Sequence, residues 1–325
     1  MFRRIDLLPR NGNYFKANLH CHSTLSDGRL TAEEIKNAYL QQGYSIVAFT
    51  EHGRYSYREE LNDDHFLALA AFEADINEER PDGSGDRART YHINLYDTEP
   101  WTNREVKCRS IYPKVNYFDK SQVNHYLKEM ESLGFIACYN HPYWSKQTYD
   151  EFVCLDPVFA MEIYNHNCER ETLSGNMAQA YSEALRYGKR WFCLATDDNH
   201  NIFGLEGPQS DSFGGFTMIH ADCLDYSNVI QSLKNGDFYC STGPEFKELY
   251  MEDRELVVKC SPVSYIYVMS DQKSCYCEAA PAGEKITEAR FRLQGNEVYI
   301  RVQCRDDQGH YLFSNGYFLD KINER

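Results

Sequence analysis

The sequence of 325 residues lacks any apolar segment close to the roughly 18 residues that a membrane-spanning helix needs. Its first fifteen residues also lack the apolar core typical of a secretory signal peptide. Positive charge is scarce, since 34 lysines and arginines face 49 aspartates and glutamates, giving a formal net charge of −15. Long nucleic acid needs a basic surface. We therefore expect a cytoplasmic protein that binds neither a membrane nor long nucleic acid.

The paired Cys-x-x-Cys motif of many zinc sites is absent too, because the 12 cysteines are scattered along the chain. In a chain without a secretion signal, most of them should be reduced core residues. The apolar content of 42% is enough to form a hydrophobic core. The length suggests either one large domain plus a small one, or two domains.

What the sequence does contain is a His-x-His pair, His20 and His22, at the end of a short apolar segment. Side chains alternate along a strand, so both imidazoles point to one face and can bind one ion. A series of further imidazoles and carboxylates lies in or just after apolar, strand-like stretches: Asp27, His52, Glu73, His92, His141, Asp198 and His200. This ordered set predicts a multinuclear metal site.

Taken singly, these residues have plainer interpretations. Asp27 is followed by glycine, and Asp-Gly is a turn dipeptide. Glu73 could be a surface helix glutamate. Asp197 competes with Asp198 as a ligand, although the spacing to His200 favours Asp198.

Strand-like segments alternate with helical ones. A helix should begin after Thr31, which forms a capping box with Glu34, and should end at Gly43. Further helices are expected at 119–133, 172–187 and 228–234. Strands are expected at 14–19, 45–50, 91–96, 135–139, 160–164, 191–195 and 213–219, whereas 67–72 is open to helix or strand. In the strand 160–164, Glu162 is a candidate for facing the interior.

This alternation implies a parallel barrel or a doubly wound sheet. The candidate ligands fall at the C-terminal ends of strands, where barrels carry their active sites. After Gly243-Pro244 only short alternating segments follow, at 256–259, 264–269, 289–293 and 297–303. We therefore predict two domains, 1–243 and a small all-β, sandwich-like one at 244–325, with a polar loop at 77–89.

In this order, the segments LHCHSTLSDGRLTAEEI, VAFTEHG, FEAD, YHINL, YNHPYW and TDDNH resemble the PHP (polymerase and histidinol phosphatase) family over residues 14–243. The C-terminal addition, preceded by STGP, resembles the CehA/McbA-like branch, in which a small β domain follows. The resemblance implies a distorted (β/α)7 barrel with two or three divalent ions, often manganese, zinc or iron.

The resemblance also implies how the ligands are shared. One metal would be held by His20, His22, Glu73 and Asp198. Glu73 would bridge to a second metal, held also by His92 and His141. A third would be held by Asp27, His52 and His200. The chain departs from the family pattern at Glu51, where Asp is frequent, and at Asp27, where some members have His.

Imidazole and carboxylate without thiolate suit zinc, manganese or iron. Two such ions about 3.5–4 Å apart can activate water at neutral pH. We therefore predict a metal-dependent phosphoesterase that uses a metal-bound hydroxide on a small phosphorylated metabolite, nucleotide or short oligonucleotide. The third metal, or a metal-linked histidine such as His200, would help the leaving oxygen. Arg54 would contact the phosphate, although a solvated loop arginine is the plainer interpretation.

Two other functions stay open at this point. The same site could hydrolyse a non-phosphate ester or amide, as the CehA/McbA resemblance allows. Alternatively, the chain could be a non-catalytic binding protein that keeps a structural metal. The sequence gives no oligomeric state.

Overall fold

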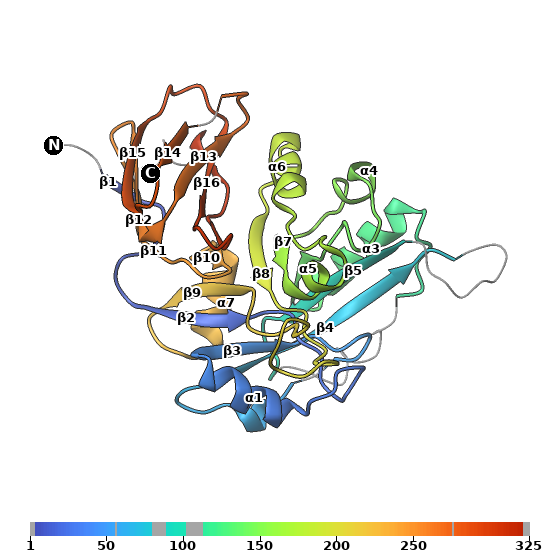
Figure 1. Cartoon of the computed structure of the whole chain (residues 1–325). Coiled ribbons are helices and arrows are strands. Elements are labelled where there is room, and N and C mark those ends of the chain that lie inside the picture. The colour runs from blue at the N-terminus through green and yellow to red at the C-terminus, as the bar shows by residue number, and fades with distance from the viewer. Residues whose placement is uncertain (1–3, 56, 80–88, 102–112, 275, 321–325) are drawn as a thin grey trace.

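The computed structural model describes residues 4–55, 57–79, 89–101, 113–274 and 276–320, so most of the predicted polar loop 77–89 lies outside these ranges. The fold is mixed α/β, with long sheets and few, short helices (Figure 1). Among the described residues, no helix is both long enough and apolar enough to span a bilayer.

One long sheet carries the N-terminal two thirds of the chain. In this part its strand order is β10-β9-β2-β3-β4-β5-β6-β7-β8. The strands are β2 (Asn13–Asn18), β3 (Tyr44–Phe49), β4 (Leu67–Asn77), β5 (Thr90–Asp97), β6 (Phe135–Tyr139), β7 (Ala160–Asn165), β8 (Phe192–Thr196), β9 (Phe216–Ala221) and β10 (Phe238–Ser241). The open choice at 67–72 is thereby settled as a strand, and a long one.

The predicted (β/α)7 barrel is not confirmed, because the described strands form an open order. The pairs β2–β3, β3–β4, β6–β7 and β7–β8 are parallel, but β4–β5, β5–β6, β2–β9 and β9–β10 are antiparallel. No ladder joins β8 to β9 within the described ranges. The two lie close through the Thr217 hydroxyl, which donates to the Ala195 carbonyl (3.0 Å) and accepts from the Ala195 N–H (3.2 Å).

Burial explains why the antiparallel pair looked parallel in the sequence. Nearly every residue of β4 is buried, and all of β5 is buried. Strands covered on both faces show continuous apolar runs rather than alternation, which is the pattern of parallel strands. The change of strand direction from β4 to β5 therefore cannot be recognised from the hydrophobic pattern of the sequence.

The helices are α1 (Ala32–Gln41), α3 (Lys120–Ser132), α4 (Tyr149–Phe152), α5 (His166–Thr172), α6 (Ala178–Tyr187) and α7 (Tyr226–Asn235), with the 3-10 turn η1 (Glu59–Leu61). The capping box of α1 is confirmed: Thr31 N–H donates to Glu34 Oε2 (2.8 Å), and Glu34 N–H donates to Thr31 Oγ1 (3.3 Å).

The single helix predicted at 172–187 is wrong, because the chain breaks between α5 and α6. Leu173 adopts a left-handed conformation with φ of 55°, which ends α5. At Gly175 the backbone packs so closely that a Cβ would lie 2.1 Å from the carbonyl oxygen of Asn165. Only glycine fits there. The segment pairs with β7 instead of continuing a helix, since the Asn165 N–H donates to the Gly175 carbonyl oxygen (3.0 Å).

The C-terminal strands follow two paths. A four-stranded sheet has the order β1-β11-β12-β15, from β1 (Arg4–Asp6), β11 (Phe246–Glu252), β12 (Glu255–Val263) and β15 (Ile286–Arg292). The others extend the long sheet beyond β10: β13 (Tyr265–Ser270), β14 (Tyr276–Ala279), β16 (Tyr299–Arg305), β17 (Tyr311–Phe313) and β18 (Tyr317–Phe318). Figure 1 shows these strands, orange to red, gathered beside β10.

Both C-terminal groups of strands share one core, since Leu256 and Val258 of β12 belong to the same buried cluster as Val268 and Ile300. Leu8, near the start of the chain, is part of that cluster too. The division at 243/244 stays a prediction, and the chain start contributes to the C-terminal packing.

Candidate metal centre

The nine predicted ligands meet at one edge of the long sheet. His20 and His22 follow β2, His52 follows β3, His141 follows β6, and Asp198 and His200 follow β8. Glu73 lies within β4 and His92 within β5. Because β5 runs antiparallel to β4, its first residues lie beside the last residues of β4. The ligands therefore reach the same edge from strands of both directions.

The innermost group is made by His20, His22, Glu73 and Asp198. Asp198 Oδ1 lies 3.1 Å from Nε2 of both imidazoles, and Glu73 Oε1 lies 3.3 Å from His20 Nε2. Ligand atoms about 2.1 Å from one ion lie about 3.0 Å apart at neighbouring octahedral positions and about 3.4 Å apart at tetrahedral ones. These separations fit a single ion.

A second group shares Glu73. Its Oε1 lies 3.1 Å from His92 Nδ1 and 3.6 Å from His141 Nε2. Asp198 Oδ2 is 3.7 Å from the same His141 nitrogen. Asp198 thus turns one oxygen toward each of two adjoining positions, as bridging carboxylates do. Glu73 Oε1 faces both groups, and Glu73 Oε2 lies 3.5 Å from His22 Nε2 and 3.2 Å from His52 Nδ1.

The outer group is more open to solvent. Asp27 Oδ1 lies 3.5 Å from His200 Nε2, and its Oδ2 lies 3.7 Å from His52 Nε2. The Asp27 side chain is 55% exposed. The ring of His22 stacks between those of His52 and His200, with centroids 4.4 and 4.3 Å apart. A substrate could reach this side of the cluster.

Unpartnered buried atoms test whether this set fits metal ions. His20 Nε2, His22 Nδ1 and Glu73 Oε2 are buried and have no hydrogen-bond partner within the described part of the chain. A buried polar atom without a partner is costly. A divalent cation would give His20 Nε2 and Glu73 Oε2 a partner. The nitrogen and oxygen donors of the cluster suit zinc, manganese or iron. The residues therefore fit the group that the sequence implied.

Glu162 of β7 contacts the innermost group on the side of His20 that faces away from Glu73 and Asp198. Its fully buried carboxylate accepts hydrogen bonds from His20 Nδ1 (2.7 Å), Thr196 Oγ1 (2.6 Å), Asn165 Nδ2 (2.9 Å) and the His141 N–H (3.1 Å). Because Nδ1 of His20 contacts Glu162, Nε2 is the nitrogen that faces Glu73 and Asp198 and that is left to bind an ion. The candidate reading that Glu162 faces the interior is confirmed, and the structure adds its partners.

Two amides that sequence reasoning missed also hold the carboxylates. Asn140 Nδ2 donates to Glu73 Oε1 (2.8 Å), and Asn165 Nδ2 donates to Asp198 Oδ2 (3.0 Å). Asn140 directly precedes His141, and Asn165 ends β7. A polar residue at the end of an apolar strand was the available signal for both.

Charges within the cluster shift its proton affinities. Burial disfavours protonation of His52, but Glu73, Asp75 and Asp27 outweigh it and raise the pKa of His52 to about 10. Burial likewise opposes protonation of His200, whose pKa the Asp27 and Asp198 carboxylates raise to about 9.

The innermost imidazoles differ from each other. Burial and the neighbouring His200 and His52 lower the pKa of His22 to about 3. For His20, burial is outweighed by Asp198, Glu73 and Glu162, which raise its pKa well above the usual range. Without ions, the site therefore holds protonated imidazoles among ionised carboxylates.

Asp197 and Glu51 are sequence neighbours of predicted ligands, but their carboxylates accept hydrogen bonds that hold nearby backbone segments. Asp197 accepts N–H groups of Phe213 (2.8 Å), Gly214 (2.9 Å) and Gly215 (2.8 Å), and the Tyr39 hydroxyl (2.8 Å). It belongs to none of the candidate metal groups among the described residues. Its role is to fix the start of β9 against α1.

Glu51 is buried and accepts hydrogen bonds from the N–H groups and hydroxyls of Ser23 and Ser26. It therefore shapes the loop that carries Asp27 rather than joining the cluster. Arg54 is exposed, and its Nη1 donates to the Leu25 carbonyl oxygen (3.0 Å). The predicted phosphate contact of Arg54 stays a prediction.

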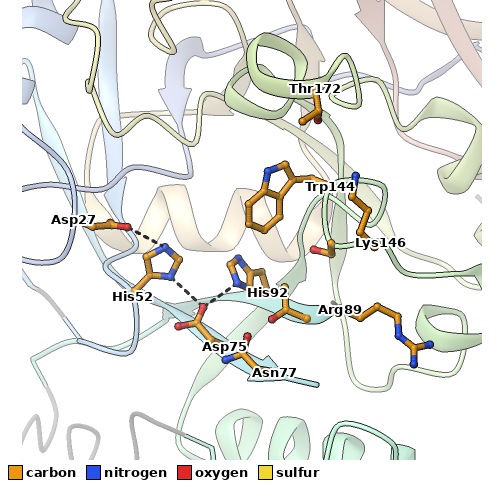
Figure 2. Close-up of a pocket in the computed structure, with 11 residues that line it drawn as sticks. Asp27, His52, Asp75, Asn77, Arg89, His92, Trp144, Lys146 and Thr172 are labelled. Atoms are coloured by element: carbon orange, nitrogen blue, oxygen red, sulfur yellow. Dashed lines mark hydrogen bonds and ion pairs between the residues drawn. The ribbon is translucent and has the colours of Figure 1, made fainter. Parts of the chain in front are cut away.

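A pocket of about 600 Å³ opens beside the cluster (Figure 2). Its walls include His52 and His92 on one side and Trp144, Lys146 and Thr172 on the other. Lys146 adopts a left-handed conformation, with φ of 58°, in the turn that follows His141. Strained backbone of this kind often marks functional sites. The pocket can hold a small molecule but not a long polymer.

Comparison with known proteins gives distant likenesses only. No family model and no curated protein matches the sequence. Among solved structures, the chain resembles a two-domain protein from Bacteroides vulgatus containing a predicted PHP-like metal-dependent phosphoesterase, with 14% identity, a TM-score of 0.43, and coverage of 95% of this chain and 98% of that one.

Two further structures are similar at the same level. One is a candidate metal-dependent phosphoesterase from Bifidobacterium adolescentis, with 13% identity, a TM-score of 0.39, and coverage of 62% of this chain and 91% of the other. The second is an amidohydrolase from Chromobacterium violaceum with bound sulfate and no metal, with 15% identity, a TM-score of 0.38, and coverage of 57% and 87%. At such identities and TM-scores, function has to be argued from this chain's own residues.

Proposed function

We propose that the chain is a metal-dependent phosphoesterase of the PHP type, acting on a small phosphorylated substrate. One observation carries the proposal: nine imidazoles and carboxylates from across the first 200 residues converge, with ligand-atom separations that suit two or three ions. A site kept only for packing would not leave His20 Nε2 and Glu73 Oε2 buried without partners.

Each group of residues has a distinct task in this proposal. His20, His22, Glu73 and Asp198 would hold one ion, Glu73 with His92 and His141 a second, and Asp27, His52 and His200 a third. Divalent ions supply Lewis-acid activation of the ester and of water. Glu162 orients His20, and the exposed side of Asp27 leaves room for the substrate.

Substrate size and charge follow from the pocket. A volume of about 600 Å³ suits a phosphorylated metabolite, a nucleotide or the end of a short oligonucleotide. Lys146 lines the wall opposite His52 and places a cation where the rest of an anionic substrate would lie. Arg54 is a second candidate for contact with phosphate. Manganese, zinc and iron are the proposed ions.

We also propose the finer features that the sequence resemblance implies: the CehA/McbA-like branch, a barrel-like arrangement of the strands β2–β9, and a cytoplasmic location. The proposed division into 1–243 and 244–325 would suit that branch, because a small β unit would follow the site-bearing part. The shared core of the C-terminal strands is consistent with such a unit.

The test is hydrolysis of p-nitrophenyl phosphate, bis-p-nitrophenyl phosphate and p-nitrophenyl acetate by protein loaded with manganese. We expect one of the two phosphate esters to be hydrolysed, with loss of at least a hundredfold in kcat/KM for Asp198→Asn and no change for the exposed control Asp64→Asn. Hydrolysis of the acetate alone would indicate a carboxylic ester hydrolase. Metal binding without any turnover would indicate a binding protein.

A further inference from the structure

Asp75 lies at the metal centre, although the sequence did not single it out. It follows Glu73 by two residues in β4, so both side chains point to the same face of the sheet. It also stands directly opposite His92 in the antiparallel ladder of β4 and β5. Figure 2 shows its carboxylate between the rings of His52 and His92.

A single oxygen of Asp75 contacts both rings. Asp75 Oδ1 is 3.0 Å from His52 Nδ1, where it makes a hydrogen bond, and 3.2 Å from His92 Nε2. The side chain is only 9% exposed. The contact with His52 is a hydrogen bond and that with His92 an ion-pair contact, and a carboxylate at such distances from imidazole nitrogens is placed for charge-assisted hydrogen bonding.

The other nitrogen of each ring faces the proposed ions. His52 Nε2 points toward Asp27 Oδ2 (3.7 Å), and His92 Nδ1 points toward Glu73 Oε1 (3.1 Å). A neutral imidazole has one N–H and one lone pair, so the nitrogen that donates to a carboxylate leaves the opposite nitrogen as the metal ligand.

We propose that Asp75 is a positioning residue that selects the metal-binding nitrogen of two ligands. By accepting N–H from His52 Nδ1 and His92 Nε2, it presents Nε2 of His52 and Nδ1 of His92 to the ions. The inference rests on the metal centre of the proposed function, and it does not depend on which ester is hydrolysed.

The alternative is that Asp75 itself binds an ion, since ligand atoms of His52, Glu73, Asp75 and His92 all lie within 4.8 Å of one another. The orientation of the two rings favours the positioning role. An ion at Asp75 Oδ1 would use His52 Nδ1 and His92 Nε2, and would turn the lone pairs away from Asp27 and Glu73. Glu73 Oε2 also lies 3.2 Å from His52 Nδ1, yet it has no hydrogen-bond partner in the described ranges. The N–H of His52 is therefore assigned to Asp75.

The experiment compares Asp75→Ala and Asp75→Asn with Asn77→Ala. Asn77 is a matched control, because it lies two residues farther along the same face of β4 and lines the same pocket. Metal content at saturation is measured by mass spectrometry of the eluted ions, and affinity for manganese or zinc by competition with a chromophoric chelator. The unfolding temperature of each metal-free variant shows whether it folds.

For Asp75→Ala we expect the full number of ions at saturation, with affinity for the weaker-bound ions reduced about 10- to 100-fold. Asp75→Asn should lose less, since its carbonyl oxygen can still accept one N–H. Asn77→Ala should stay within twofold of the original protein. In ¹⁵N spectra of the zinc form, His52 should be protonated at Nδ1, and in Asp75→Ala this preference should weaken.

Unchanged affinity in Asp75→Ala, or the loss of one whole ion at saturation, would overturn the inference; the second result would make Asp75 a ligand. If the original protein binds no divalent ion, both the inference and the proposed function fail. If it binds ions but hydrolyses no ester, only the proposed function fails, and the Asp75 variants still decide the inference.

Discussion

Protons and metal ions compete for the outer group of the site, and this competition predicts a steep pH dependence of metal affinity. Burial lowers the pKa of both His52 and His200, but the neighbouring carboxylates outweigh it. Glu73, Asp75 and Asp27 raise the pKa of His52 to about 10, and Asp27 and Asp198 raise that of His200 to about 9. Both imidazoles are therefore protonated at pH 7 in the metal-free protein. An ion held by Asp27, His52 and His200 must displace both protons.

The cost can be worked out from these values. At pH 7, removing a proton from a group with a pKa of about 10 costs about 4 kcal/mol, and from one of about 9 it costs about 3 kcal/mol. Together they weaken the apparent affinity of this position roughly 10⁵-fold relative to the deprotonated site. Each rise of one pH unit should then strengthen binding about a hundredfold, until the pH approaches 9.

The innermost position should respond less. The pKa of His22 is lowered to about 3 by burial and by the neighbouring imidazoles, so this ring has no proton to lose. Only His20, whose pKa is raised, competes there. We expect its affinity to change about tenfold per pH unit at most, so the ions should load in sequence as the pH rises.

The assay is a chelator-competition titration with zinc at pH 6.5, 7.0, 7.5 and 8.0. The weakest-binding ion should show a slope of about two log units per pH unit. His200→Asn should reduce this slope to about one or abolish the position, whereas the exposed control His125→Asn should leave it unchanged. A slope of one or less for every ion in the original protein would refute the reasoning.

Three other changes test separate contacts. Glu162→Gln should weaken the innermost ion about 10- to 100-fold, because His20 Nδ1 loses an ionised acceptor; equal affinity by chelator competition would contradict this. Tyr39→Phe should lower the free energy of unfolding in urea by about 1.5–3 kcal/mol, since its hydroxyl donates to a buried carboxylate 2.8 Å away. The control Tyr44→Phe removes a buried hydroxyl that has no hydrogen-bond partner in the described chain, and should cost nothing; similar losses in both would refute the assignment. Lys146→Ala should raise KM for p-nitrophenyl phosphate roughly two- to fivefold, the effect of a surface ion pair, with kcat nearly unchanged. An unchanged KM would remove Lys146 from the substrate pocket.

The convergence of the candidate ligands was easier to predict from the sequence than the fold, and the reason is physical. His20, His52 and His141 each end an apolar strand, and an imidazole at a strand end has few roles other than ligand or hydrogen-bond partner. The order of the motifs therefore carried the information. Asp75 lies inside a strand, as Glu73 and His92 do, but the family resemblance that singled out those two residues gave Asp75 no role. Its spacing of two residues from Glu73 was the available signal.

The helical breaks could not be predicted, because they depend on contacts distant in sequence. The pattern 172–187 is compatible with one helix. It is divided because the Gly175 backbone packs onto Asn165, the residue that caps α5 and holds Asp198. The break therefore helps to hold Asn165, which donates to Asp198 of the candidate metal centre. The hydrophobic periodicity of the sequence does not indicate it.

The reversal at β5 shows why the candidate ligands converge although a (β/α)7 barrel is not confirmed. Convergence requires only that ligand-bearing ends share one sheet edge, whichever way each strand runs. In β4 the candidate ligand Glu73 lies in the second half, and in antiparallel β5 the candidate ligand His92 lies near the start, so both reach the same edge. An antiparallel strand with His92 near its end would have placed that imidazole at the opposite edge. The position of a ligand within its strand thus encodes the strand's direction, provided that the site is assumed first.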